Sequence, residues 1–445
     1  MTPERDEMNE QLHQRHLQRQ KERQRRQKQN RQAVLRLVMM MAALAMAVAL
    51  IVWGSVNAPD GQATQPTDTG AQNQTTTVPA TQTTASQPTQ EVAATEPTTV
   101  IHIAAAGDLN VTDTVITDAT TVAGHDFTDA FLDVAPVVSA ADLSIINFEG
   151  TLAGVPYGTE TGSAPAALAE ELAAIGVDVV QTANSASIRA GVLGLQSTLA
   201  GFRNAGVTPV GTFADSEAFR RSGGFTMVEV EGIRIALVAF TKGMDNLGLP
   251  EGSEDCVNLL YEDYTTDYKK IAADSITDIL RDVEAAQPDL TIALLHWGSE
   301  YNENISDSQE DIRDLMLDNG VDAIIGTHSH LLQPIEFDET AGTLVAWSLG
   351  DFYGDAKESG SNYSVILDLE ITLDNLTGLT SITGYSTTPV YTLKPEQSAA
   401  GGYRVVRIEK AISRYESGYI GRVTEDAYNS LCQALTRVEK RIAGE

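Results

Sequence analysis

Cysteine is nearly absent from this 445-residue chain, which contains only Cys256 and Cys432. A protein stabilised by a framework of disulfides is therefore excluded, because such scaffolds are rich in cysteine. No spacing rule links two cysteines so far apart in sequence, so they form either one disulfide or two isolated thiols. Neither has the basic or histidine-containing surroundings of a reactive thiolate, and we predict that neither is catalytic.

Positive charge is scarce beyond the first 36 residues. The chain has 30 Lys or Arg against 61 Asp or Glu, and residues 1–36 hold ten of the basic residues but only five of the acidic ones. The remaining chain therefore carries 20 basic and 56 acidic residues. A surface with this excess repels nucleic acid at long range, which argues against nucleic acid as a partner of the folded part.

Long hydrophobic runs are also missing, except at residues 37–56. This segment of 20 residues carries no charge, and its length matches the hydrocarbon core of a bilayer. The flank before it is basic and the flank after it is not. We therefore predict an uncleaved transmembrane anchor in the cell membrane, with residues 1–36 as a basic cytoplasmic tail and the rest of the chain extracellular. The alternative, a cleaved signal peptide, usually has a shorter apolar region.

Residues 57–99 are a low-complexity mixture of Thr, Gln, Pro and Ala with almost no large apolar side chains. Such a segment cannot bury enough surface to offset its chain entropy. We predict a disordered stalk that holds the following domain away from the membrane.

From residue 100 onward, strand patterns alternate with helix patterns, which predicts an α/β fold. After residue 334 the strands follow one another with little helix between them, and this shift indicates a second, largely antiparallel layer. The last part of the chain, residues 396–445, reads as a strand (Val405 to Ala411) and a helix. We therefore expect a main domain at residues 100–395 with a C-terminal extension.

One stretch, Val321 to Glu336, combines a buried strand with metal-type side chains. Its apolar run ends at Gly326, and His328 and His330 follow at once. In an extended segment, residues two apart point the same way, so both imidazoles would face one spot beyond the strand end. The alternative is an exposed loop that happens to carry two histidines.

Other predicted strands also end in polar or metal-type residues. These are Asp108, Glu149, Asn184 and His296. Open α/β sheets place their sites at the carboxyl ends of their strands. Taken singly, each residue could be a turn, a cap or a buried histidine with one hydrogen bond. Together they form a ligand mixture that suits one or two divalent metal ions such as Mn, Fe, Zn or Co.

Five blocks of sequence around these residues resemble the CapA family of poly-γ-glutamate capsule synthesis proteins. The blocks are Gly107-Asp108, Asn147-Phe148-Glu149, His296-Trp297-Gly298-Ser299-Glu300-Tyr301, Gly326-Thr327-His328-Ser329-His330 with Gln333-Pro334-Ile335-Glu336, and Trp347-Ser348-Leu349-Gly350-Asp351-Phe352. The resemblance implies a calcineurin-like metallophosphatase fold, an α/β/β/α sandwich.

The same resemblance implies roles for the residues at the strand ends. Asp108 and Glu149 would supply carboxylate ligands to the metal, with Glu149 as a bridge, and the imidazole ligands would be His296, His328 and His330. Glu300 and Glu336 would orient ligands or line the groove rather than touch the metal.

The chain departs from the family pattern after the third strand. The family has Ala-Asn-Asn-His-x-x-Asp there, whereas this chain has Ala183-Asn184-Ser185-Ala186-Ser187-Ile188-Arg189. Ser185 stands in place of a ligand Asn, Ala186 in place of an acid or clamping His, and Arg189 in place of the Asp. The remaining catalytic candidates are His296, Asn184 and Arg189, whose guanidinium suits a carboxylate or phosphate unless it is only a surface arginine.

Two functions are favoured at this point, beside a third alternative, a generic phosphatase unrelated to polymer synthesis. The first is synthesis, export or anchoring of an anionic capsule polymer, by metal-dependent hydrolysis or transfer. The second is a catalytically impaired binding or scaffold protein on the same fold. For either function the expected partners are the membrane, the anionic polymer or its precursor, and other capsule-synthesis membrane proteins.

Overall fold

The computed structural model describes residues 97–445 apart from 399 and 420–422. The predicted cytoplasmic tail, the predicted anchor at 37–56 and the predicted stalk up to residue 96 lie outside the described residues. Within the described part of the chain, no helix combines the length and the apolar character needed to cross a bilayer.

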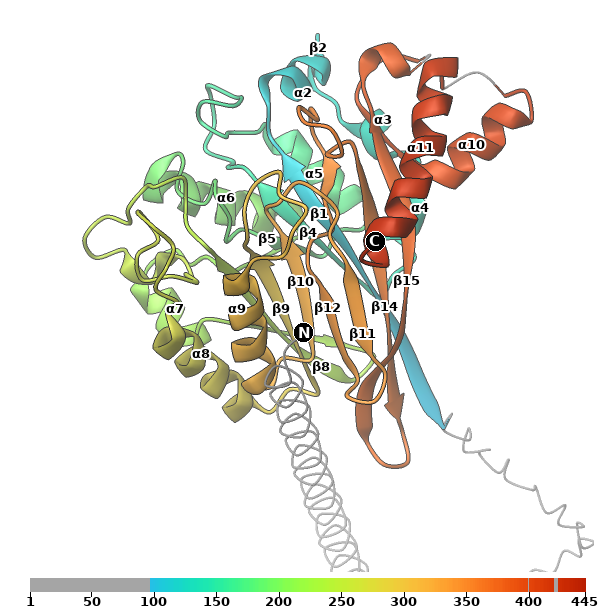
Figure 1. The fold of residues 1–445 in the computed structure, drawn as a ribbon. Helices are drawn as coiled ribbons and strands as arrows, with labels where there is room; N and C mark the ends of the chain where they lie inside the picture. Colours follow the sequence, from blue (N-terminus) through green and yellow to red (C-terminus); the bar gives the residue numbers. More distant parts are fainter. Residues whose placement is uncertain (1–96, 399, 420–422) are drawn as a thin grey trace, which may run out of the picture.

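The first sheet is built mainly from the early and the late parts of the described chain (Figure 1). Its strands are β1 (Thr98–Asn110), β4 (Leu143–Glu149), β5 (Val179–Gln181), β6 (Thr208–Val210), β13 (Asp351–Tyr353), β14 (Tyr363–Asp374), β15 (Leu379–Leu393) and β16 (Arg404–Arg407). They run in the order β16-β15-β14-β1-β4-β5-β6, with β13 also paired to β1. The strands β1, β4, β5, β6 and β13 pair in parallel with one another, whereas β14 pairs antiparallel with both β1 and β15, and β15 pairs antiparallel with β16.

The second sheet is formed by the middle of the chain. Its strands are β7 (Thr226–Val230), β8 (Ile233–Thr241), β9 (Leu290–His296), β10 (Ala323–Thr327), β11 (Ile335–Asp338) and β12 (Thr343–Ala346), in the order β11-β12-β10-β9-β8-β7. The predicted hairpin between β7 and β8 is confirmed. Its turn residues Glu231 and Gly232 have φ angles of 47° and 80°, and two successive positive φ angles are typical of a tight hairpin turn.

Helices cover the outer faces of both sheets and, at the C-terminal end of the chain, part of the core between them (Figure 1). They are α2 (Asp113–Asp118), α3 (Thr128–Phe131), α4 (Ala135–Val138), α5 (Ala166–Ala174), α6 (Gly191–Ala205), α7 (Ser216–Ser222), α8 (Ala273–Ala286), α9 (Asp307–Asp318), α10 (Ile408–Glu416) and α11 (Glu425–Ile442). Short elements complete the chain: β2 (Thr120–Thr121), β3 (Gly124–His125), η1 (Glu254–Cys256) and η2 (Pro395–Gln397).

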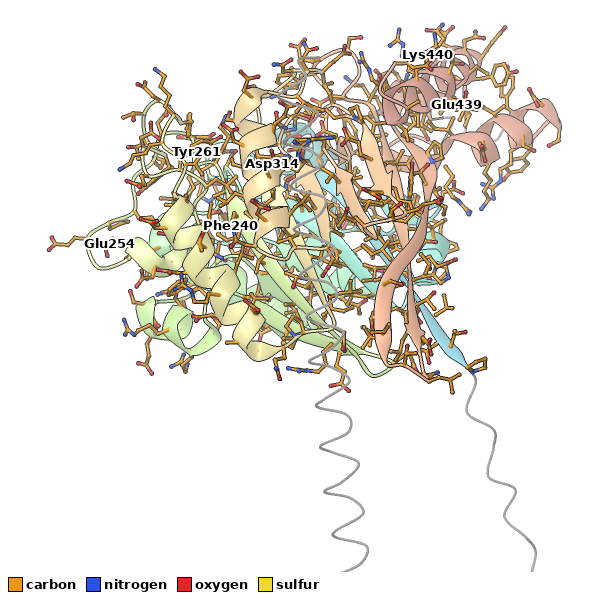
Figure 2. All side chains as sticks on the ribbon, turned by 60° about the horizontal axis from the view of Figure 1, so that its bottom comes forward. Phe240, Glu254, Tyr261, Asp314, Glu439 and Lys440 are labelled. Carbon is orange, nitrogen blue, oxygen red and sulfur yellow. The ribbon has the colours of Figure 1, made fainter. Side chains whose placement is uncertain are left out.

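The alternation of side chains along the strands produces this layering. On β1, Ile103 and Ala105 face the core between the two sheets, whereas Ala104 and Ala106 pack with the helices outside the first sheet. The second sheet behaves in the same way, and Phe240 and Tyr261 belong to its outer cluster on the side of α8 and α9 (Figure 2). The predicted mixed α/β fold is therefore confirmed, and its layers follow the order helix, sheet, sheet, helix.

Helix α9 shows how local sequence determines its own ends. Ser306 caps the amino end by accepting a hydrogen bond from the backbone of Gln309, whose side chain bonds back to the backbone of Ser306. At the other end, Asn319 and Gly320 stop the helix as predicted, with Gly320 at a φ of 87°. The helix delivers the chain into β10, which leads to the two histidines.

The C-terminal segment differs from its prediction in one element. The predicted strand from Val405 to Ala411 is wrong beyond Arg407, because α10 begins at Ile408. In this helix Ile408 and Ala411 turn toward the inter-sheet core. Both cysteines are free, so of the two alternatives for Cys256 and Cys432 the isolated thiols are what the structure shows.

Candidate metal centre

Strands from both sheets bring six metal-type side chains together, five of them near or just after the carboxyl ends of strands and the sixth at the start of β13. They form two groups: Glu149, His296 and His328, and next to them Asp108, His330 and Asp351. Within each group, one ligand atom per residue lies within 4.8 Å of the others. All five residues that the sequence suggested as metal ligands are gathered here, and their role as ligands stays a prediction.

The first group centres on Nε2 of His296, which is fully buried at the end of β9. This atom lies 3.5 Å from Oε1 of Glu149 and 3.0 Å from Nδ1 of His328. The hydroxyl of Ser185 lies 3.0 Å from the same His296 nitrogen and 3.4 Å from Nδ1 of His328. The other ring nitrogen of His296 lies 3.0 Å from the hydroxyl of Thr327, which orients the ring.

The second group includes a residue that the sequence analysis missed. Nδ1 of His330 lies 2.8 Å from Oδ1 of Asp351 and 3.7 Å from Oδ2 of Asp108. Asp351 is the first residue of β13, which pairs in parallel with β1 so that Asp351 stands opposite Asp108. A signal was present, since Asp351 follows Gly350 in one of the five sequence blocks, but nothing in the local pattern showed which strand it would join.

The backbone around the two histidines is not extended. His328 and His330 have φ angles of 92° and 59°, a region that non-glycine residues seldom adopt and that often marks functional sites. The expectation that an extended backbone would aim both rings at one spot is therefore wrong, although the rings do converge. The backbone N–H of His328 donates to Oδ2 of Asp108 over 3.1 Å and helps to hold this conformation.

Asn184 is connected to the metal centre through hydrogen bonds with its neighbours. Its side-chain amide donates to Oδ1 of Asn147 and to the carbonyl of Phe148, and its oxygen accepts from the backbone of Ala186. Asn147 in turn donates to Oδ1 of Asp108. This chain of hydrogen bonds places Asn184 as a support for Asp108, and the predicted catalytic role of Asn184 is untested. Asn147 was also missed, although it precedes Phe148 and Glu149 in a block of the resemblance.

Arg189 belongs to neither group. Its guanidinium pairs with Asp245 on the loop after β8, and its side chain lies against Gly162. Ser185 and Ala186 are both buried, the latter completely. The segment that departs from the family pattern therefore forms a closed wall, and the predicted catalytic role of Arg189 stays a prediction.

Burial and mutual charge shift the pKa values of the centre in opposite directions. Burial, reinforced by the charge of Glu149, raises the pKa of Asp108 to about 7. Burial acts to raise the pKa of Glu149 as well, but the charge of His296 outweighs it and the pKa is lowered. The ion pair with Asp351 raises the pKa of His330 to about 11 against the effect of burial, whereas burial and His296 lower that of His328 well below its ordinary value.

These residues fit divalent metal ions. Oε2 of Glu149 is buried and has no hydrogen-bond partner among the residues that the structure describes, which is costly unless a cation or a proton donor satisfies it. Three buried carboxylates lie against three imidazoles, and this is the oxygen and nitrogen donor set that Mn, Fe, Co and Zn accept. The position of Asp108 between the groups, 4.0 Å from His296 and 3.7 Å from His330, makes the two groups contiguous.

Of the two glutamates expected to orient ligands, Glu336 is engaged elsewhere. Its Oε1 accepts a hydrogen bond of 3.0 Å from the indole of Trp347. Glu300 is exposed and close enough to Lys242 to raise the pKa of that amine, although burial outweighs it and the net shift is downward. Lys242 and Tyr301, which the sequence analysis did not assign, lie at the rim of the centre.

The fold has two packed sheets, and carboxylates and imidazoles gather at the ends of their strands. These two features together define a candidate metal-binding protein. The family model described as "Bacterial capsule synthesis protein PGA_cap" matches residues 102–356. Because this match spans more than half of the chain, the protein belongs to that family, and the predicted CapA resemblance is confirmed.

Individual relatives agree with the family assignment. The chain is 29% identical over 182 residues to the PGA biosynthesis protein CapA of Bacillus subtilis, a match that covers 40% of this chain and 42% of that protein. It is 26% identical over 247 residues to a probable polyglutamine synthesis accessory protein of Mycobacterium tuberculosis, covering 52% of this chain and 61% of the relative. The chain thus matches less than two thirds of the length of either relative.

Among solved structures, the calcineurin-like phosphoesterase YfkN from Bacillus subtilis is similar with a TM-score of 0.42 and 15% sequence identity, covering 77% of this chain and 98% of that one. A likeness at this level says nothing about activity.

Proposed function

We propose that this protein is a membrane-anchored, extracytoplasmic member of its family that acts on an anionic capsule polymer of the poly-γ-glutamate type by metal-dependent hydrolysis or transfer. The observation that carries the proposal is the pair of contiguous ligand groups around Asp108 and Glu149. Side chains from separate strands of two sheets converge there, and the unpartnered oxygen of Glu149 calls for a cation.

In this proposal each group of three residues binds one metal ion. Glu149, His296 and His328 hold one cation, and Asp108, His330 and Asp351 hold the other. When bound, divalent ions activate a water molecule and stabilise negative charge on the reacting oxygens. His296 acts as a ligand rather than a free proton carrier, since both of its nitrogens already face Glu149, His328 or Thr327.

The test uses the full chain, purified in detergent. Metal content is measured first, and then turnover of a phosphoester and of poly-γ-glutamate with added Mn²⁺. We expect turnover that depends on metal and that His330→Ala abolishes, while the exposed charge variant Arg203→Met leaves it unchanged. Turnover that survives both chelation and His330→Ala would exclude metal-dependent catalysis at this centre.

Ser185 and Ala186 favour a second candidate, a binding or scaffold protein on the same fold. Ser185 supplies one hydroxyl to two imidazoles, and the methyl group of Ala186 can neither donate a proton nor contact an anion. For a scaffold, the native protein shows no turnover, and Ser185→Asn, alone or with Ala186→His, creates some. Full activity of the native protein contradicts this candidate.

The proposed placement has its own measurement. Protease added to intact cells should digest the domain after residue 100 and spare a tag placed before residue 37. Digestion of the tag and not of the domain overturns the proposed orientation. Cross-linking in the same cells tests for capsule-synthesis membrane proteins as partners.

A further inference from the structure

Two polar side chains that no ligand group uses lie at the rim of the metal centre. One is Lys242, which directly follows β8. Its neighbour Thr241 is in register with His296 on β9, and the backbone N–H of Lys242 donates to the carbonyl of His296 over 2.8 Å. The backbone of Lys242 is thereby fixed to the backbone of a candidate ligand.

The side chain of Lys242 is held in place by a carbonyl group and an aromatic ring, and neither of them neutralises its positive charge. Its Nζ donates to the carbonyl of Gly298 over 2.6 Å and lies 4.6 Å from the centre of the Tyr268 ring. Among the residues that the structure describes, it makes no ion pair within 4 Å. An ammonium group has three donors, so this arrangement positions a positive charge beside the first ligand group, where it acts on His328.

Tyr301 covers the second ligand group. Its ring stacks on the ring of His330 with a centroid distance of 5.1 Å and an angle of 28° between the planes. The residue has a φ of 54°, and its backbone N–H donates to the carbonyl of Ser329 over 2.8 Å. Tyr301 is 42% exposed, and the carboxylates that act on its hydroxyl include Asp351 and Glu149. The ring of Tyr301 therefore lies between His330 and solvent.

The wall formed by residues 184–189 offers no comparable donor. The hydroxyl of Ser185 is shared by His296 and His328, Ala186 has no polar side-chain group, and Arg189 is paired with Asp245. Outside this wall, Lys242 is tied to the backbone of His296 and Tyr301 stacks on His330, so both place a donor group beside the ligand groups. An anion needs such donors here, because the surrounding carboxylates repel it.

We infer that Lys242 and Tyr301 form an oxyanion-holding pair that binds a phosphate or carboxylate group of the substrate over the metal centre. This inference rests on the proposed function and deepens it by naming the groups that recognise the substrate. Lys242 supplies charge next to Glu149, His296 and His328, and Tyr301 supplies a neutral hydrogen bond next to His330.

The experiment measures binding rather than turnover. The full-length protein is loaded with Mn²⁺, its metal content is determined, and inorganic phosphate and a γ-linked glutamate oligomer are titrated separately by calorimetry. The variants are Lys242→Met, which keeps the aliphatic stem, and Tyr301→Phe, which keeps the stacked ring. Arg203→Met is the charge-matched control, because Arg203 lies in the last turn of α6, at the amino ends of the strands.

We expect Lys242→Met to weaken binding of the preferred probe roughly 10- to 100-fold, as for a hydrogen bond to a charged group. Tyr301→Phe should weaken it less, roughly 2- to 10-fold, because it removes one hydrogen bond and no charge. Metal content and the behaviour of Arg203→Met should match the native protein. The probe that binds more tightly tells whether the recognised group is phosphate or carboxylate.

The outcomes distinguish a failure of this inference from a failure of the proposed function on which it rests. Native affinity in both variants, with metal bound, overturns the pair and leaves the proposed function standing. A native protein that retains no metal overturns the proposed function itself, and one that holds metal but binds neither probe overturns the pair. Should Lys242→Met fail to fold, Tyr301→Phe decides by itself, since it removes only an oxygen atom.

Discussion

At the scale of single residues, Asp108 organises the metal centre. Its two oxygens accept from Asn147 and from the backbone of His328, and its own N–H donates to the carbonyl of Gly350. The glycine before it permits this last contact, because a Cβ at Gly107 would lie 1.8 Å from the oxygen of Gly350. The close approach of these two backbones places Asp351 beside Asp108.

The first prediction concerns Asp351. Asp351→Asn keeps the shape of the side chain but removes the charge that faces His330. We expect metal affinity at the group of Asp108, His330 and Asp351 to fall at least roughly 10- to 100-fold, the range seen when groups that only orient ligands are removed. The other group should keep its metal, so the measured stoichiometry should fall by half at a free metal concentration that still saturates the intact group.

Metal analysis of the purified variant by mass spectrometry checks this expectation. Asp368→Asn is the matched control, since Asp368 lies on β14 and pairs with His102 away from the centre. Unchanged stoichiometry and affinity in Asp351→Asn would show that Asp351 is not a ligand.

At the scale of elements, Asp133 ties the C-terminal segment to the first sheet and its helices. Its carboxylate accepts from the backbone of Arg407 and from the guanidinium of Arg414, each over 3.0 Å, and lies 3.3 Å from Nζ of Lys410. Asp133 lies between α3 and α4, so β16 and α10 are anchored through one buried acidic residue.

The second prediction follows from these contacts. Burial acts to raise the pKa of Asp133, but the hydrogen bond from Arg407 and the charges of Lys410, Arg407 and Arg414 outweigh it, so the pKa is lowered from its ordinary value. A lowered pKa in the folded state means that the carboxylate stabilises the fold above the unfolded-state pKa and loses this effect as the pH falls. Asp133→Asn should therefore lower the free energy of unfolding at pH 7 by about 1–3 kcal/mol.

Urea denaturation of both proteins at pH 7 and at pH 3 measures the effect. The difference between the native protein and Asp133→Asn should shrink at the lower pH, because the carboxylate of the unfolded chain then binds a proton before the carboxylate of the folded protein does. A difference of the same size at both pH values contradicts the assignment. Asp278→Asn serves as control, since Asp278 forms an exposed pair with Arg281 on α8.

At the scale of the whole molecule, the core between the sheets extends beyond the sheets to the C-terminal helices. Ile408 of α10 and Leu431 and Val438 of α11 belong to it and are fully buried. Helix α11 lies beside β14 and β15 (Figure 1). The segment 396–445, expected from the sequence to be an extension, thus covers part of the core of the main domain.

The third prediction is that removal of residues 396–445 destabilises the whole domain. Truncation of one large buried side chain typically costs about 2–5 kcal/mol, and this deletion exposes the surface that several such side chains cover. We expect the shortened protein to lose cooperative thermal unfolding and to be digested rapidly by protease. Removal of residues 443–445, after the end of α11, is the control. An unchanged melting temperature after the long deletion would show that the extension is dispensable.

The local pattern of the sequence determined most of the elements of this protein. Apolar runs and alternation located β1, β4, β9 and β10, and the polar residues directly after them indicated the candidate ligands. Such signals are local, since burial of a strand requires apolar residues along it whatever its partners are. The residue blocks also sufficed to predict the family.

Tertiary structure alone decided which strand ends meet. The pairing of β13 with β1 brought Asp351 to Asp108, and the packing of the two sheets brought Lys242 and Tyr301 to the rim and paired Arg189 with Asp245. The left-handed backbone at His328 and His330 likewise depends on contacts with distant residues such as Asp108. These features arise from pairing over long sequence separations, and a periodic pattern within one segment holds no information about its partner.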